Sequence, residues 1–245
     1  MKQPTPNRSK SGSIGWSCPS NIALIKYWGK RDFQIPMNPS ISMTLMEART
    51  HTTLNYAYHP ESHGRKLKFR FHGKEAPEFE ARIHKFMDDI TPLIPALSHT
   101  SLEIESENTF PHSSGIASSA SAMGALALCL VQFQEEVAEP LEQDHFWQKA
   151  SQIARMGSGS ASRSIYPRFV LWGATEGWDR SSDQYATPLT GFHNTFENLR
   201  DAILIVESGQ KKVSSSAGHA QQVDATTRVG GGATEAAQVN HVERT

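Results

Sequence analysis

A chain of 245 residues, 38% of them hydrophobic, can bury the core of one large domain or of two smaller domains. Its 24 Lys and Arg residues nearly balance 25 Asp and Glu residues, and the formal net charge of −1 argues against nucleic acid or an anionic membrane as a partner. No apolar window approaches the length of a membrane-spanning helix.

The N-terminus is polar and basic and has no apolar run, so we expect a loose leader over residues 1–15 rather than a signal peptide. Cys18 and Cys129 have neither Cys-x-x-Cys spacing nor a histidine pair at zinc-ligand spacing beside them. Free thiols in a cytoplasmic protein are the simplest interpretation. We expect the eleven histidines in loops or on the surface rather than on a metal.

Residues 16–27 have the pattern of a strand, and the turn-prone Gly29 follows. Basic and aromatic residues surround this turn, and they are Lys26, Tyr27, Trp28, Lys30 and Arg31. Because lysines act as point charges and Tyr27 offers a hydroxyl, the segment can bind an anionic substrate. The alternative is a strand end with solvated charges.

Apolar and polar residues alternate over residues 38–45, 52–58 and 67–71, which predicts three antiparallel strands. Residues 77–89 carry apolar side chains at helical spacing and predict an amphipathic helix that packs on the sheet. Residues 101–105 predict a short strand that leads into the next loop.

The segment Asn108–Gly124 is a loop of small and hydroxylated residues that runs into an apolar helix. Short side chains let a ligand approach the backbone N–H groups at the helix start, where the helix dipole favours anions such as phosphate. The serines can also cap the first turn. An ordinary Ser-capped helix with a flexible lead-in remains the alternative, since neither a Walker motif nor Gly-x-Gly-x-x-Gly is present.

A second helix is predicted over residues 145–156, and a second small-residue loop, Gly157–Ser164, follows it. Consecutive N–H groups in such a loop can bind an anion, and Arg163 can offer a bidentate fork to a carboxylate or phosphate. A plain Gly/Ser linker is the alternative. Two anion-competent loops together indicate a ligand with two anionic ends.

Residues 168–174 predict a buried strand, residues 183–188 an edge strand and residues 202–206 an apolar strand. Lys211 and Lys212 then lie in a third polar loop or in a solvated turn. From residue 221 to 245 the chain has no Leu, Ile, Met or aromatic residue, so we expect a disordered tail.

Five segments together resemble the diphosphomevalonate decarboxylases of the galactokinase, homoserine kinase, mevalonate kinase and phosphomevalonate kinase (GHMP) superfamily. The resemblance covers about residues 16–219, and the segments are Asn21–Asp32, Asn38–Leu45, Pro111–Ala120, Gly157–Ser164 and Lys211–Gly218. It implies an α/β (α+β) fold, with an N-terminal domain like ribosomal protein S5 domain 2 over residues 16–200. It also implies the start of a C-terminal domain over residues 201–220, and it is compatible with a homodimer.

By this resemblance, the loop before the first small-residue helix binds ATP through Pro111, Ser114, Gly115, Ala117, Ser118 and Ser119, with Mg²⁺ held through ATP near Ser118. The implied substrate-binding residues are Ala23, Tyr27, Lys30, Ser158, Gly159, Ser160 and Arg163, and the catalytic residues are Lys30, Arg163 and Ser215. In the implied reaction, the 3-hydroxyl of mevalonate 5-diphosphate is phosphorylated by ATP, and phosphate and CO₂ then leave to give isopentenyl diphosphate. That step belongs to isoprenoid biosynthesis.

The family places an aspartate that orients or deprotonates the 3-hydroxyl in the C-terminal domain, and no residue of this chain matches its motif. The featureless sequence after Ala220 is what a frame shift or an early end of the coding sequence would produce. We therefore expect poor stability and little turnover. Two other interpretations stay open: a small-molecule kinase that does not decarboxylate, and a remnant that binds ligands without chemistry.

Overall fold

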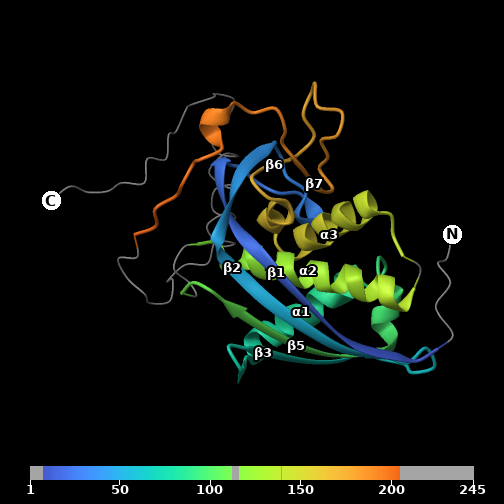
Figure 1. Ribbon diagram of the computed structural model, residues 1–245. Coiled ribbons are helices and arrows are strands. Elements are labelled where there is room, and N and C mark those ends of the chain that lie inside the picture. Colours follow the sequence, from blue (N-terminus) through green and yellow to red (C-terminus); the bar gives the residue numbers. More distant parts are fainter. Residues whose placement is uncertain (1–7, 112–115, 139, 205–245) are drawn as a thin grey trace, which may run out of the picture. The chain divides into compact units, whose positions relative to one another are not determined.

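The structure, a computed structural model, describes residues 8–111, 116–138 and 140–204 (Figure 1). Its longest strands are β1 (Lys10–Ile25) and β2 (Ser40–Tyr58), which pair antiparallel over nearly their whole length. The register shifts between Pro19 and Ser20, where proline supplies no N–H to the ladder. Both strands are therefore continuous but irregular near their middle.

The remaining strands extend this pair into one mixed sheet with the order β4-β3-β5-β2-β6-β7, and β1 pairs with β2. The C-terminal half of β2 pairs with β5, and its N-terminal end pairs with β6. All neighbours are antiparallel except β3 and β5, which are parallel. The bounds are β3 Lys66–Phe71, β4 Lys74–Glu75, β5 Thr100–Asn108, β6 Phe169–Trp172 and β7 Ala186–Pro188.

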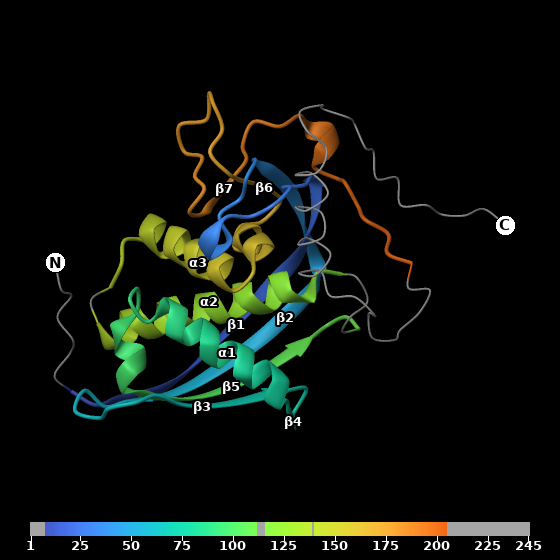
Figure 2. The same cartoon turned by 180° about the vertical axis from the view of Figure 1, so that it is seen from behind.

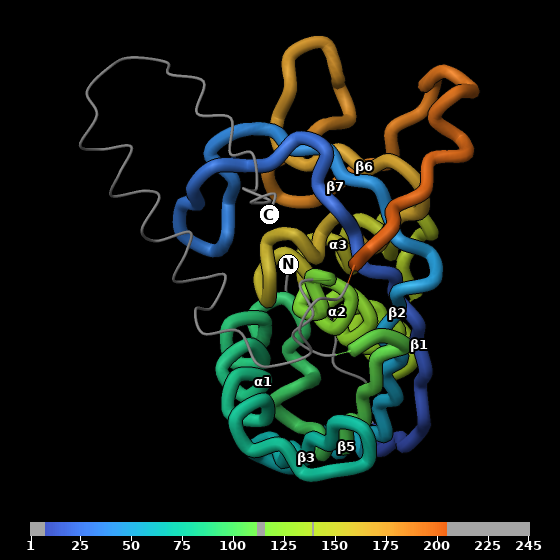
Figure 3. Tube along the Cα trace, turned by 90° about the vertical axis from the view of Figure 1, so that its left-hand side faces the viewer, coloured from blue at the N-terminus to red at the C-terminus, as the bar shows by residue number. Residues whose placement is uncertain are grey.

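Three helices lie on the same side of the sheet, as Figures 2 and 3 show. They are α1 (Pro77–Ile90), α2 (Ser118–Val137) and α3 (Gln143–Gly157), and α1 lies over β3. Helix α2 contacts β1 and β2 on one side and α3 on another, so it is buried around most of its circumference. The short 3-10 helices are Asp32–Gln34, Pro95–His99, Gly159–Ser164 and Asn194–Phe196.

A glycine allows α2 to lie close to the sheet. A Cβ atom at Gly124 would meet Sγ of Cys18 at 2.4 Å, which is far inside van der Waals contact. Small residues in the first half of α2, among them Ala120 and Ala125, are fully buried against the same region. Helix α2 thus lies between β1 and α3.

The structure confirms the three predicted helices and corrects the predicted strands. The segments 38–45 and 52–58 are one strand, because β2 continues through the polar residues between them. Strand β3 is parallel to β5 rather than antiparallel, since the chain returns through α1 before it enters β5. Residues 159–164 form a 3-10 helix instead of a loop.

The predicted leader and C-terminal strand also differ from the structure. Residues 10–15 belong to β1, and Ile14 is 2% exposed. The prediction of a loose leader over residues 1–15 is therefore wrong for residues 10–15. Residues 202–204 have no regular secondary structure, and Leu204 is 90% exposed. The rest of that predicted strand, the polar loop after it and the tail at 221–245 lie outside the described residues. No helix in the described ranges is long and apolar enough to cross a bilayer.

Candidate functional site

The centre of the site is the guanidinium of Arg163, which the 3-10 helix after α3 places inside the domain. Arg163 is 2% exposed, and its Nη1 donates to Oγ of Ser40 at 2.6 Å. The guanidinium carbon lies 5.5 Å from the ring centroid of Tyr27 and 5.6 Å from that of Trp172. Burial lowers the pKa of Arg163 to about 10, so the side chain is a fixed cation at neutral pH.

The guanidinium itself and the serine two positions after Ser40 on β2 each hold a buried polar atom that has no hydrogen-bond partner among the described residues. They are Nε of Arg163 and Oγ of Ser42. An unsatisfied buried polar group costs about 1–3 kcal/mol. A polar ligand that reaches these atoms would remove that cost. Ala23 is the residue of β1 that pairs with Ser42.

Tyr27 and Lys30 bring a second cation to the same aromatic pair. The Tyr27 ring centroid is 5.0 Å from that of Trp172, and Lys30 Nζ is 5.6 Å from the Tyr27 centroid. Burial lowers the pKa of Lys30, and burial raises the pKa of Tyr27 although Arg163 opposes the rise. Tyr27 therefore keeps its hydroxyl proton between two positive charges.

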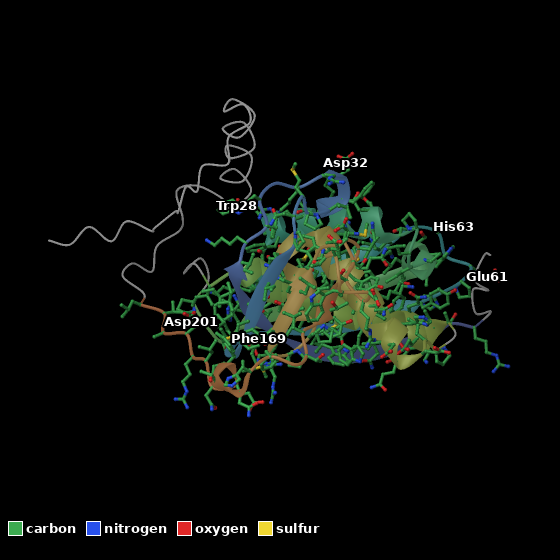
Figure 4. All side chains as sticks on the ribbon, turned by 90° about the horizontal axis from the view of Figure 1, so that it is seen from above. Trp28, Asp32, Glu61, His63, Phe169 and Asp201 are labelled. Carbon is green, nitrogen blue, oxygen red and sulfur yellow. The ribbon has the colours of Figure 1, made fainter. Side chains whose placement is uncertain are left out.

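The rest of the basic and aromatic segment points elsewhere. Lys26 and Arg31 are exposed, and Trp28 is 47% exposed. Figure 4 shows Trp28 and Asp32 on the connection between β1 and β2, near the edge of the molecule. Tyr27 and Lys30 therefore lie beside Arg163, whereas the charges of Lys26 and Arg31 are solvated.

The segment Ser158–Ser160 lies directly against the aromatic pair. A Cβ atom at Gly159 would lie 2.9 Å from the Trp172 ring and 3.4 Å from the Tyr27 hydroxyl, so only glycine fits without displacing them. Nδ2 of Asn21 donates to the carbonyl of Ser160 at 3.0 Å, which ties this segment to β1. The glycine at this position is explained by close packing.

The start of α2 is the second half of the site. Its N-cap residue, Ala117, has φ 50° and ψ 46° and makes no side-chain capping bond, and the first turn contains no acidic residue. The predicted serine cap is therefore wrong for the described residues. A helix start without a side-chain cap keeps its N–H groups available for an anion.

The two small-residue segments lie side by side. Oγ of Ser119 is 3.4 Å from Oγ of Ser158, which in turn is 3.5 Å from Oγ of Ser160. Two cavities of about 280 and 520 Å³ lie elsewhere, beside Tyr166 and beside Trp16, and neither is lined by the site residues. The structure thus brings the two segments together.

Some predicted site residues cannot be placed. Ser114, Gly115 and Ser215 lie outside the described residues, while Pro111 is exposed at the edge of the described range and Ser118 opens α2. Sequence analysis missed Ser40, Ser42 and Trp172. Hydroxyl residues at alternate positions of a strand were a signal for the first two, because the inward face of a strand is normally apolar.

Comparisons with known proteins give a consistent result. The diphosphomevalonate decarboxylase-like N-terminal domain family matches residues 18–186. A diphosphomevalonate decarboxylase of Eremothecium gossypii is 35% identical over 219 residues, which are 84% of this chain and 52% of that protein. The chain spans about half the length of the curated relatives it matches.

Two solved structures are similar in fold and sequence. Mevalonate diphosphate decarboxylase from Staphylococcus aureus has a TM-score of 0.65 at 35% identity, covering 86% of this chain and 59% of that one. The enzyme from Enterococcus faecalis, described in a study of mevalonate diphosphate-mediated ATP binding, has a TM-score of 0.56 at 31% identity. That match covers 74% of this chain and 52% of the other.

Proposed function

The chain belongs to the diphosphomevalonate decarboxylase-like family, and we propose that it carries the substrate-binding and nucleotide-binding residues for ATP-dependent decarboxylation of mevalonate 5-diphosphate in the cytoplasm. The products are isopentenyl diphosphate, ADP, phosphate and CO₂. The observation that carries the proposal is the pair of cations, Arg163 and Lys30, held around Tyr27 next to an uncapped helix start.

The substrate has a diphosphate at one end and a carboxylate at the other. Each of the two cations can bind one of these anionic ends. Arg163 is the fixed partner for an anion, because Ser40 and two aromatic rings hold its guanidinium. Lys30 and the hydroxyl of Tyr27 are the other donors, and Ser158, Ser160 and the backbone around Gly159 line the same region. Ala23 contributes an apolar wall on β1.

The ATP phosphates fit the start of α2. The helix dipole and the N–H groups near Ser118 and Ser119 attract an anion, and no acidic side chain in the first turn opposes it. The described residues hold no group of three His, Cys, Asp or Glu side chains suited to a metal. Mg²⁺ would therefore be held mainly by the phosphates, where it supplies neutralising charge.

The chemistry requires that the carboxylate be held while a leaving group departs. The γ-phosphoryl group of ATP passes to the tertiary 3-hydroxyl, and ADP is released. The C–O bond to the new phosphate then breaks, the C–C bond to the carboxylate supplies the electron pair of the new double bond, and CO₂ leaves. A buried cation such as Arg163 fixes the carboxylate for this step through electrostatic preorganisation. We assign Ser215 a place near the transferred phosphate.

A turnover assay that measures ADP, phosphate and CO₂ together tests the proposal. Equal amounts of the three products support decarboxylation. ADP without phosphate or CO₂ would identify a simple kinase instead. Calorimetry with mevalonate 5-diphosphate separates the remaining cases: binding without ADP release indicates a ligand-binding role, and the absence of both binding and turnover contradicts the proposal.

A further inference from the structure

We propose that Arg155 is a positioning residue for Lys30, through the loop that connects β1 to β2; its value to a reaction rests on the function proposed above. Arg155 lies in the last turn of α3 and is 2% exposed. None of the ion pairs recorded between described residues includes it. The carboxylate of Asp183 favours its charge electrostatically but forms no ion pair with it. A buried cation without an ion pair is costly, so its hydrogen bonds indicate what it does.

All three nitrogen atoms of the Arg155 guanidinium donate to oxygen atoms on two loops. Nε and Nη2 donate to the main-chain carbonyl and to Oε1 of Gln184, at 2.8 and 3.1 Å. Nη1 donates to the main-chain carbonyl of Phe33. Arg155 therefore joins the end of α3 to the 3-10 helix Asp32–Gln34.

Backbone hydrogen bonds close the turn around that 3-10 helix, such as Arg31 N to Ile35 O at 2.8 Å and Met37 N to Gly29 O at 3.4 Å, but they lie within the loop itself. Phe33 and Gln34 both have left-handed backbone angles, with φ of 55° and 62°, which non-glycine residues adopt only at a cost. No residue of the helix is buried, and the Phe33 side chain is 69% exposed. Side-chain burial does not explain this conformation, and the bond from Arg155 to the Phe33 carbonyl ties the turn to α3.

The same conformation orients Lys30. Its Nζ donates to Oε1 of Gln34 at 2.6 Å, and its backbone forms an isolated bridge with Pro36. A loop that moved away would take the Gln34 acceptor with it and open Lys30 to water. Arg163 lies in the 3-10 helix that directly follows α3, so the end of α3 is linked to both cations around Tyr27.

The competing explanation is that Arg155 only stabilises the domain. Lysine NMR distinguishes the two, because the pKa of Lys30 can be measured on the ligand-free chain with ¹³C-labelled lysine, the signal being assigned with Lys30→Arg. The variants are Arg155→Met and, as a matched control, Arg65→Met. Arg65 is also buried, with a side chain 9% exposed, but it contacts Asp88 and Thr91 far from the loop.

We expect Arg155→Met to raise the pKa of Lys30 toward its usual value of about 10.4, because the ammonium regains water. Arg65→Met should leave the pKa of Lys30 unchanged. Arg155→Lys, which keeps one donor nitrogen, should give a Lys30 pKa between that of the unmodified chain and that of Arg155→Met. A second variant, Gln34→Met, removes the acceptor while the Arg155 bond to the loop remains, so it should not raise the pKa. A Lys30 pKa that does not rise in Arg155→Met, or that rises equally in Arg65→Met, overturns the proposal.

Binding provides a second readout. Calorimetry should show mevalonate 5-diphosphate binding weakened by about tenfold in Arg155→Met and unchanged in Arg65→Met. Unchanged affinity in Arg155→Met would contradict the functional part of the inference. If the unmodified chain does not bind this ligand, the proposed function fails, whereas the Lys30 titration still decides whether Arg155 positions Lys30.

Discussion

The buried charge of Arg163 illustrates how a side chain suited to ligand binding can lower the stability of the fold. Its guanidinium is buried beside two aromatic rings, its Nε has no partner among the described residues, and burial lowers its pKa. A protein selected only for stability would place an apolar side chain of similar size there. The charge is therefore best explained by an anionic ligand.

This argument predicts opposite effects of Arg163→Met on stability and on binding. Without the buried charge, the ligand-free variant should unfold at a temperature equal to or above that of the unmodified chain. Its affinity for mevalonate 5-diphosphate should fall by about 100-fold, because a charge-assisted hydrogen bond is lost. Thermal scans and calorimetry measure the two effects. A clear loss of thermal stability would show that Arg163 is structural.

The sequence singled out three residues that the fold brings together, Tyr27, Lys30 and Arg163. Tyr27, Lys30 and Arg163 are chemically distinctive and lie in short motifs, so residue type alone marked them. Ser40 and Trp172 belong to strands that pair only in the folded chain, and their contact with Arg163 depends on that pairing. A local pattern carries no information about which strands become neighbours.

At the scale of elements, helices were easier to predict than strands. Apolar residues repeat at helical spacing within α1 and α3, and that repeat is local. The continuity of β2 is not local, because pairing with β1 resumes at Arg49 and pairing with β5 begins at Thr50, on either side of the register shift. The parallel pairing of β3 with β5 likewise follows from the path through α1.

Helix α2 depends on one glycine for its distance from β1, and Gly124→Ala tests this. The added Cβ would clash with Cys18 Sγ, so we expect the free energy of unfolding to fall by about 1–3 kcal/mol in urea denaturation. Gly15→Ala is the control, since nothing lies within 4 Å of a Cβ there. Cys18→Ala in the same chain should recover part of the loss, and strictly additive effects would reject the steric explanation.

At the scale of the whole molecule, the described residues leave apolar side chains exposed at one end of the β1–β2 pair. The exposed fractions are 38% for Ile22, 53% for Leu24 and 54% for Ile25 in β1, and 47% for Trp28 just after it. Apolar groups gathered on a surface favour association with another surface. This feature bears on whether the chain is a homodimer, which the sequence left as a prediction.

We therefore predict that the chain self-associates reversibly through this end of the strands. Light scattering coupled to size exclusion, over a dilution series, should show a mass that falls with concentration. The double variant Leu24→Gln, Ile25→Gln should shift the chain toward monomer. Trp178→Gln, which changes an exposed aromatic residue on a different loop, should not. A monomer at every concentration would contradict the prediction.

The global stability of the domain should also depend on pH through its buried thiols. Burial raises the pKa of Cys129 from 9.0 to about 12, because the thiolate is disfavoured in the core. Between these values the unfolded chain loses the thiol proton and the folded chain keeps it. The unfolded state then binds fewer protons, so this contribution to stability is complete below pH 9 and is lost as the pH rises.

Comparison with Cys129→Ala isolates the effect from other groups that titrate at high pH. Lys30 and Arg163 have lowered pKa values and contribute in the opposite direction, but they are present in both proteins and cancel in the difference. Between pH 7 and pH 10.5, the unmodified chain should lose up to about 2 kcal/mol more in urea denaturation than the variant does. Equal losses would mean that Cys129 reaches solvent in the folded chain, and that the α2–sheet interface is looser than its full burial implies.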